Sequence, residues 1–151
     1  MEELRAEEAL STFGIYSSFT RGTSMWPLFK THRDRVYLAR VTDTLRPLDV
    51  AMYPDAHGNY IMHRVVRVCE DHYLIRGDNT FVLERVPHEC VIGVLIEFDR
   101  NGKHSTVSSP AYRLYSRVWN LLYPVRYLFH GLLTLLRRIR RKFRTKKSDR
   151  P

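Results

Sequence analysis

Apolar and polar residues alternate along most of the first two thirds of the chain, with the period of two that indicates β-strands. Groups of Gly, Pro, Asn and Asp interrupt the alternation at intervals of about 8–12 residues, the spacing of turns in an all-β barrel or coiled sheet. We therefore predict a mainly β fold preceded by a short helix. The predicted helix covers residues 2–10, and the predicted strands cover residues 13–21, 35–41, 50–53, 60–68, 73–76 and 91–98.

A different pattern begins at Pro110, where apolar residues recur at helical spacing with arginines between them as far as residue 143. Pro124 predicts a kink or a new helix start. Residues 118–136 are nearly long enough to span a bilayer, but they include Arg126, and a central arginine costs about 2.5–3.5 kcal/mol on insertion. We favour an amphipathic helix in a membrane interface, ahead of a helix packed on the body or on a partner; a true span ranks last.

The formal net charge of +9 is concentrated at the end of the chain. Residues 137–151 hold nine of the 25 Lys and Arg residues but one of the 16 Asp and Glu residues. Such a basic end attracts anionic lipid. Aromatic side chains, on which bases would stack, are nearly absent from this end of the chain apart from Phe143. We therefore predict no nucleic-acid partner.

Candidate catalytic residues follow in the order serine, histidine, acid. Ser24 lies in a turn that Gly22 makes tight, and His63 lies in a strand on the face opposite to Arg64. A serine hydroxyl needs a base to remove its proton, and histidine titrates near neutral pH. No His/Cys pair has the spacing of a zinc site, and we predict no metal and no cofactor.

Five short motifs occur in one order and carry a resemblance. They are Ser24-Met-Trp-Pro, Leu48-Asp-Val, His63-Arg-Val-Val, Gly77-Asp-Asn and Val91-Ile-Gly-Val. Over roughly residues 10–105 the chain resembles the serine peptidase superfamily of type I signal peptidases and self-cleaving SOS repressors. The His-Arg pair is similar to the eukaryotic, archaeal and sporulating-bacterial signal peptidases, and the compact chain is similar to small bacterial members.

The resemblance implies a coiled β-sheet in which Ser24 is the nucleophile and His63 the general base. The usual bacterial enzymes have a lysine where His63 stands. The third member stays open between two acids, because relatives have a second aspartate where this chain has Glu84. Either Glu84 orients the imidazole or Asp78 takes that role.

The resemblance also suggests contacts with the substrate. Thr23, Met25 and Trp26 are expected to contact the bound peptide. Many relatives have a serine at the position of Gly22 that helps to hold the oxyanion. Here the Ser24 N–H remains, with Thr23 as a candidate second donor, so we expect a slow enzyme or one that needs a partner.

We therefore predict a serine peptidase domain at residues 1–108 with its core at 13–104, an amphipathic segment at 110–143 and a basic disordered tail at 144–151. The expected activity is cleavage of a signal-type or leader-type peptide. Because the acidic first residues precede no apolar run, we expect no export signal, and place the protein in the cytoplasm on the inner membrane face. The alternatives are a self-processing repressor-like peptidase and a non-catalytic protein that binds anionic membrane through its basic helix.

Overall fold

The computed structural model describes residues 6–148 of the chain, and the side chains of residues 6–138. The chain divides into two units, Met1–Asn120 and Leu121–Pro151. Within the described range the elements in chain order are α1 (Ala6–Phe13), β1 (Ile15–Phe19), β2 (Arg35–Arg40), β3 (Val50–Pro54), β4 (Tyr60–Val68), β5 (His72–Arg76), β6 (Glu84–Pro87), the 3₁₀ turn η1 (His88–Cys90), β7 (Gly93–Arg100), β8 (Lys103–Thr106), α2 (Pro110–Leu121) and α3 (Tyr123–Ser148).

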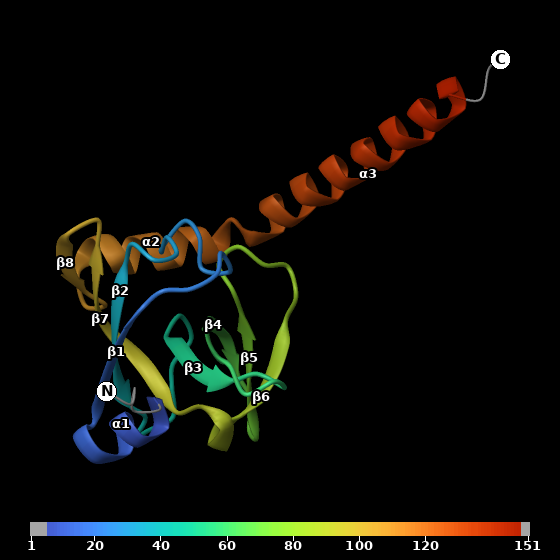
Figure 1. Ribbon diagram of the computed structural model, residues 1–151. Coiled ribbons are helices and arrows are strands. Elements are labelled where there is room, and N and C mark those ends of the chain that lie inside the picture. The colour runs from blue at the N-terminus through green and yellow to red at the C-terminus, as the bar shows by residue number, and fades with distance from the viewer. Residues whose placement is uncertain (1–5, 149–151) are drawn as a thin grey trace. The chain divides into compact units, whose positions relative to one another are not determined.

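All eight strands belong to one curled antiparallel sheet in the order β1-β2-β7-β3-β4-β5-β6, with β8 paired to β7 (Figure 1). In the view of Figure 1, β1 and β2 run nearly vertically whereas β3 runs across it, so the sheet curls into a half-barrel. The predicted mainly β class is therefore confirmed.

The curl places β3 between two hydrophobic clusters, and its residues point alternately into each. Val50 and Met52 belong to the first cluster, while Ala51 and Tyr53 belong to the second. The first cluster also contains Leu10 of α1, which explains why the amphipathic N-terminal helix packs on the sheet. Both faces of β3 are therefore buried.

Two strands lie where the sequence predicted none. β6 and β8 have four residues each, and their patterns are broken by charged and polar side chains. Neither therefore shows the apolar alternation that marks a strand. The missed strand β6 begins with Glu84, so the error concerns the candidate site directly.

Helix α2, apart from Leu121, belongs to the first unit, which ends at residue 120, whereas we predicted a peptidase domain of residues 1–108. Tyr112 and Ser116 of this helix are buried, as expected for a helix packed on the body. The first turn of α3 contains Pro124, where the missing N–H is tolerated.

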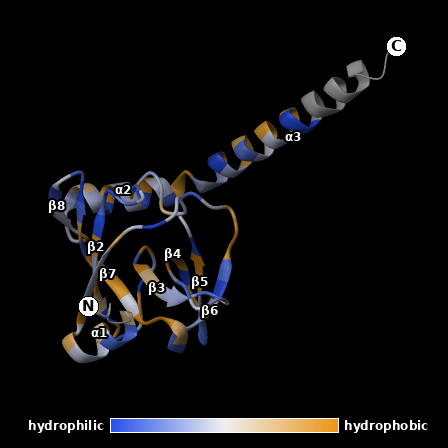
Figure 2. Ribbon diagram, in the orientation of Figure 1, coloured by the Kyte–Doolittle hydropathy of each residue, from blue (hydrophilic) through white to orange (hydrophobic). Residues whose placement is uncertain are grey.

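Helix α3 continues to Ser148, so the predicted disordered tail is wrong for residues 144–148; residues 149–151 lie outside the described range. Its ribbon carries both hydrophobic and hydrophilic turns (Figure 2). Many of its apolar side chains are exposed, among them Val125, Leu128, Phe129, Leu132 and Leu135. In the part of the chain that the structure describes, neither α3 nor any other helix has an apolar stretch long enough to cross a bilayer.

Candidate active site

The loop that carries Ser24 connects β1 to β2. Gly22 has a φ of 75°, a left-handed conformation that other residues adopt only with strain, and it turns the chain toward Ser24. The loop then closes on itself, since the Trp26 N–H donates to the Thr23 carbonyl at 3.1 Å. Met25 is only 6% exposed and packs in the first cluster, so it anchors the loop to the core. Ser24 itself is half-buried.

His63 lies on β4 opposite Ala51 of β3. The residue is buried, with 6% of its surface exposed. Tyr53, the diagonal neighbour of His63 across the β3–β4 pair, places its hydroxyl oxygen 3.1 Å from His63 Nδ1. The strand register thus brings two polar rings together in an otherwise apolar region.

Glu84 completes this group from β6. Its Oε1 lies 2.9 Å from His63 Nδ1, and its Oε2 accepts a hydrogen bond of 2.8 Å from the Tyr53 hydroxyl. A carboxylate can only accept hydrogen bonds, so the neutral imidazole in this contact carries its proton on Nδ1. Nε2 then keeps its lone pair, which is the state that a general base needs.

Gly77 brings His63 and the Ser24 loop together. A Cβ atom at this position would lie 2.7 Å from the Ser24 carbonyl oxygen and 3.1 Å from His63 Nε2. Only a residue without a side chain fits there, so the Ser24 carbonyl and the unshared nitrogen of His63 both lie against Gly77. Asn79, two residues after Gly77 in the same turn, donates its N–H to the same Ser24 carbonyl at 2.7 Å.

The Ser24 hydroxyl and the Ser24 N–H make no hydrogen bond to any residue of the described range 6–148. The hydroxyl is therefore not hydrogen-bonded to His63. In free enzymes such contacts are often long and shorten when substrate binds. The unused N–H is a donor that an oxyanion formed at Ser24 would meet.

Burial lowers the pKa of His63 below its ordinary value of about 6.5, because a charged ring is disfavoured away from water. The charge and hydrogen bond of Glu84 oppose this effect, as does the charge of Asp78. Burial and the hydrogen bond to Glu84 raise the pKa of Tyr53, so its hydroxyl keeps its proton. At neutral pH the site therefore contains a neutral imidazole beside a neutral phenol.

Asp78 contacts a different partner. Arg64 donates two hydrogen bonds of 2.7 Å to the two oxygens of Asp78, and both side chains are 3% exposed. Burial opposes the charge of Arg64, but the hydrogen bonds and charge of Asp78 outweigh it and raise the pKa of Arg64. Of the two acids left open by the sequence, the structure places Glu84 on His63 and Asp78 on Arg64.

Helix α2 covers this ion pair. Tyr115 donates to Asp78 Oδ2 at 2.9 Å, and Trp119 Nε1 donates to the Asp78 carbonyl at 2.9 Å. Arg64 also donates to Ser116 Oγ at 3.0 Å. The helix thereby fixes the Gly77–Asn79 turn, and this turn holds the Ser24 carbonyl.

The remaining predicted residues have separate positions. Met25, expected beside the substrate, is instead a core residue, because its thioether side chain fills the first cluster. Thr23 and Trp26 are exposed and remain available for contacts. Asp49 Oδ2 accepts the Arg46 N–H at 2.7 Å and so stabilises the turn before β3.

Tyr53 was missed by sequence analysis. The signal that could have found it is the β3–β4 hairpin, whose loop at residues 55–59 sets the register. That register makes Tyr53 and His63 diagonal neighbours on one face.

No family model matches this chain, and no curated protein matches it either.

Proposed function

We propose that the chain is a serine endopeptidase that uses Ser24, His63 and Glu84 and has a signal-peptidase-like fold. The observation that carries the proposal is His63, whose Nδ1 contacts Glu84 while its Nε2 lies beside the Ser24 loop. Within the described residues His63 makes its hydrogen-bond contacts through Nδ1, so Nε2 is left available to accept a proton.

In the proposed first step, Nε2 of His63 accepts the Ser24 proton while Oγ attacks the scissile carbonyl carbon. The Ser24 N–H donates to the resulting oxyanion. Glu84 stabilises the imidazolium, which then gives its proton to the leaving amine as the carbon–nitrogen bond breaks. Water, activated in the same way, releases the acyl group from Ser24.

The proposed substrate is an extended signal-type or leader-type peptide that binds by backbone hydrogen bonds as an added strand. This assignment depends on the five motifs and their order, together with a curled sheet that presents Ser24 on an exposed loop. Trp26 is 48% exposed in that loop and is the best-placed apolar side chain to contact the peptide.

A fluorophosphonate probe tests the proposal, because it modifies only activated serines. We expect labelling of the wild-type chain and its loss in both Ser24→Ala and His63→Ala. Ser17→Ala, in strand β1, is the matched control and should label normally. Absence of labelling in the wild type, or labelling that survives Ser24→Ala, would refute the peptidase proposal.

A second candidate function concerns α3. Apolar residues at positions 125, 128, 132 and 135 recur at intervals of three and four along the helix, and all four are exposed. With the basic residues from 137 onward, this pattern favours binding to an anionic membrane surface, which we propose to be the cytoplasmic face.

Flotation with vesicles tests the membrane candidate. We expect the full chain to float with phosphatidylglycerol vesicles at low salt and to float less with phosphatidylcholine vesicles. Leu128→Gln combined with Leu132→Gln should abolish flotation, whereas Val82→Gln, an exposed apolar residue of the first unit, should not. A wild-type chain that stays in solution with both vesicles would contradict the candidate and leave the peptidase proposal untouched.

A further inference from the structure

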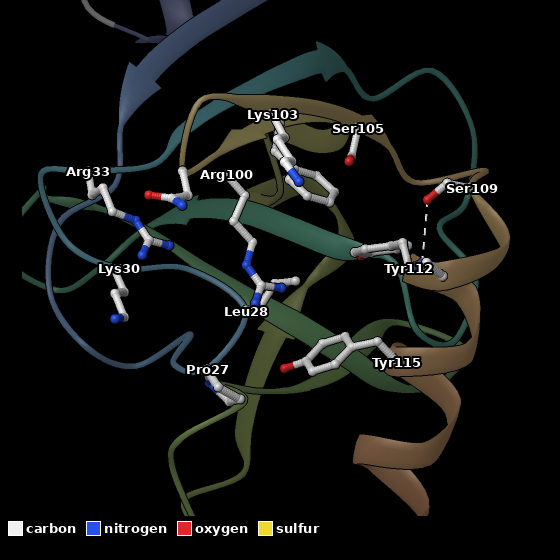
Figure 3. Close-up of a pocket in the computed structure, with 13 residues that line it drawn as sticks. Pro27, Leu28, Lys30, Arg33, Arg100, Lys103, Ser105, Ser109, Tyr112 and Tyr115 are labelled. Carbon is white, nitrogen blue, oxygen red and sulfur yellow. Dashed lines mark hydrogen bonds between the residues drawn. The ribbon is translucent and has the colours of Figure 1, made fainter.

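A hollow of about 480 Å³ adjoins the Ser24 loop (Figure 3). It begins at Pro27 and Leu28, which follow Ser24 in the same loop, and reaches the β7–β8 turn and the start of α2. Its volume falls in the range of about 300–1,000 Å³ that is typical of ligand pockets. The hollow therefore has room for several side chains of a bound molecule.

Cationic side chains gather around this hollow. Lys30, Arg33, Arg100 and Lys103 all line it. Arg33 is paired with the buried Asp34 at 2.6 Å. The other three make no ion pair with any residue in the part of the chain that the structure describes. Since residues 1–136 are nearly neutral overall, three unpaired cations at one hollow are a local excess.

The β7–β8 hairpin pairs the backbone positions of two of these cationic residues. Arg100 and Lys103 are cross-strand partners at the end of the pair. Like charges in this arrangement destabilise a hairpin, and a bound anion between them would remove the repulsion. The arrangement is unfavourable for the isolated fold, which points to a negatively charged ligand.

The remaining lining suits an anion attached to a larger chain. The first turn of α2 contains no acidic residue, and the helix begins beside Ser109 and Ala111 at the rim. Its N-terminal dipole adds positive potential. Leu28, Phe98 and Tyr112 supply an apolar floor, which a bare inorganic ion would not need.

We infer that this hollow is a subsite for acidic side chains of the peptide substrate, an inference that rests on the proposed peptidase function. Three residues of chain span at most about 11 Å, so Pro27 lies close to Ser24. An extended substrate would reach the hollow within about six residues of the cleaved bond. The substrate should therefore carry Asp or Glu in that interval.

Lysine acylation followed by mass spectrometry tests the subsite without cleavage, in the full-length Ser24→Ala chain. The probes are a polyglutamate peptide, a polyglutamine peptide of equal length, and inorganic phosphate. At a peptide concentration about ten times Kd, polyglutamate should slow acylation of Lys30 and Lys103 about tenfold, because the free fraction falls by that factor. Polyglutamine should leave both lysines reactive.

A matched pair of variants assigns the effect to the hollow. Arg100→Gln should weaken the protection of Lys30 about three- to tenfold. Arg67→Gln, an exposed arginine on β4 that does not line the hollow, should leave it unchanged. Reading each lysine separately keeps the result independent of peptide bound to the basic end of α3.

Two outcomes would overturn the subsite. In the first, polyglutamate protects lysines beyond residue 140 from acylation but leaves Lys30 and Lys103 unprotected. The other is equal protection by phosphate, which would make the hollow a small-anion site. Failure of the peptidase proposal is seen separately, as absence of fluorophosphonate labelling at Ser24 in the wild type.

Discussion

Two acidic side chains, six residues apart in sequence, lie in contrasting surroundings near Ser24. Asp78 is 3% exposed and bonded to the equally buried Arg64, whereas the side chain of Glu84 is 32% exposed and contacts His63 and Tyr53. Asp78 has a permanent positive partner, and Glu84 has a partner that can gain and lose a proton. The first arrangement stabilises the fold, and the second suits proton transfer.

The contrast separates two requirements of the proposed site. Arg64, Asp78 and α2 fix the Gly77–Asn79 turn, which holds the backbone of Ser24. Glu84 and Tyr53 fix the orientation and tautomer of His63. Substitution of Asp78 should therefore mainly lower the stability of the fold, and substitution of Glu84 should mainly lower the reactivity of Ser24.

Glu84→Gln should have the largest effect on reactivity. It removes the charge that stabilises the imidazolium and permits the wrong tautomer, so labelling of Ser24 by fluorophosphonate should slow about 10³–10⁴-fold. The melting temperature should change little, because the side chain is partly exposed. Glu89→Gln, an exposed residue of η1, is the control and should label at the wild-type rate. If Glu89→Gln labels slowly, or if Glu84→Gln labels at the wild-type rate, Glu84 has no special role in reactivity.

Asp78→Asn should have the largest effect on stability. It leaves the charge of Arg64 buried without a counter-ion, which should lower the free energy of unfolding by about 3–5 kcal/mol in urea denaturation. The comparison is Asp71→Asn, which removes a surface ion pair with Arg85 and should cost less than about 1 kcal/mol. Equal losses in the two variants would show that the buried pair has no special structural role.

These two acids also show what the sequence could and could not predict. Both were identified as candidates, but their roles depend on which strand each side chain reaches. Glu84 begins β6, a four-residue strand that has no apolar alternation, so its position two strands from His63 was not predictable. Arg64 faces away from His63 by simple alternation, and this part was predictable.

Loop residues were harder to predict than strand residues. Met25 and Trp26 are adjacent apolar residues, yet one packs in the core and the other is exposed. No periodicity orients side chains in a turn, so the sequence gives no basis for choosing between them. The packing of α2 on Asp78 likewise depends on tertiary contacts between distant segments.

Gly77→Ala should affect both regions at an intermediate level. The added Cβ would lie 2.7 Å from the Ser24 carbonyl oxygen, and backbone must move to relieve the clash. We expect a loss of about 1–3 kcal/mol in the free energy of unfolding, together with slower labelling. Gly131→Ala in α3 has open space around it and should instead raise helix stability by about 1 kcal/mol. Normal labelling by a stable Gly77→Ala chain would contradict a role for the close approach of His63 to the Ser24 loop.

Tyr53→Phe should have the smallest effect. It removes the hydrogen bond to Glu84, which should cost about 1 kcal/mol in stability and slow labelling about tenfold by loosening the carboxylate. Tyr37→Phe removes a similar hydrogen bond, to Asp99, which is not one of the proposed site residues. It should lower stability without changing the labelling rate. Identical labelling rates in the two variants would exclude a positioning role for Tyr53.

The rate of Ser24 labelling as a function of pH tests the central claim most directly. Because the pKa of His63 is lowered by burial, the wild-type rate should be constant from about pH 7 to 9 and fall only below about 6.5, as the ring becomes protonated. In Glu84→Gln the midpoint should move to still lower pH, since the carboxylate that favours the charged ring is gone. A rate that rises steadily through pH 9, or a midpoint that Glu84→Gln does not move, would contradict a proton relay through His63.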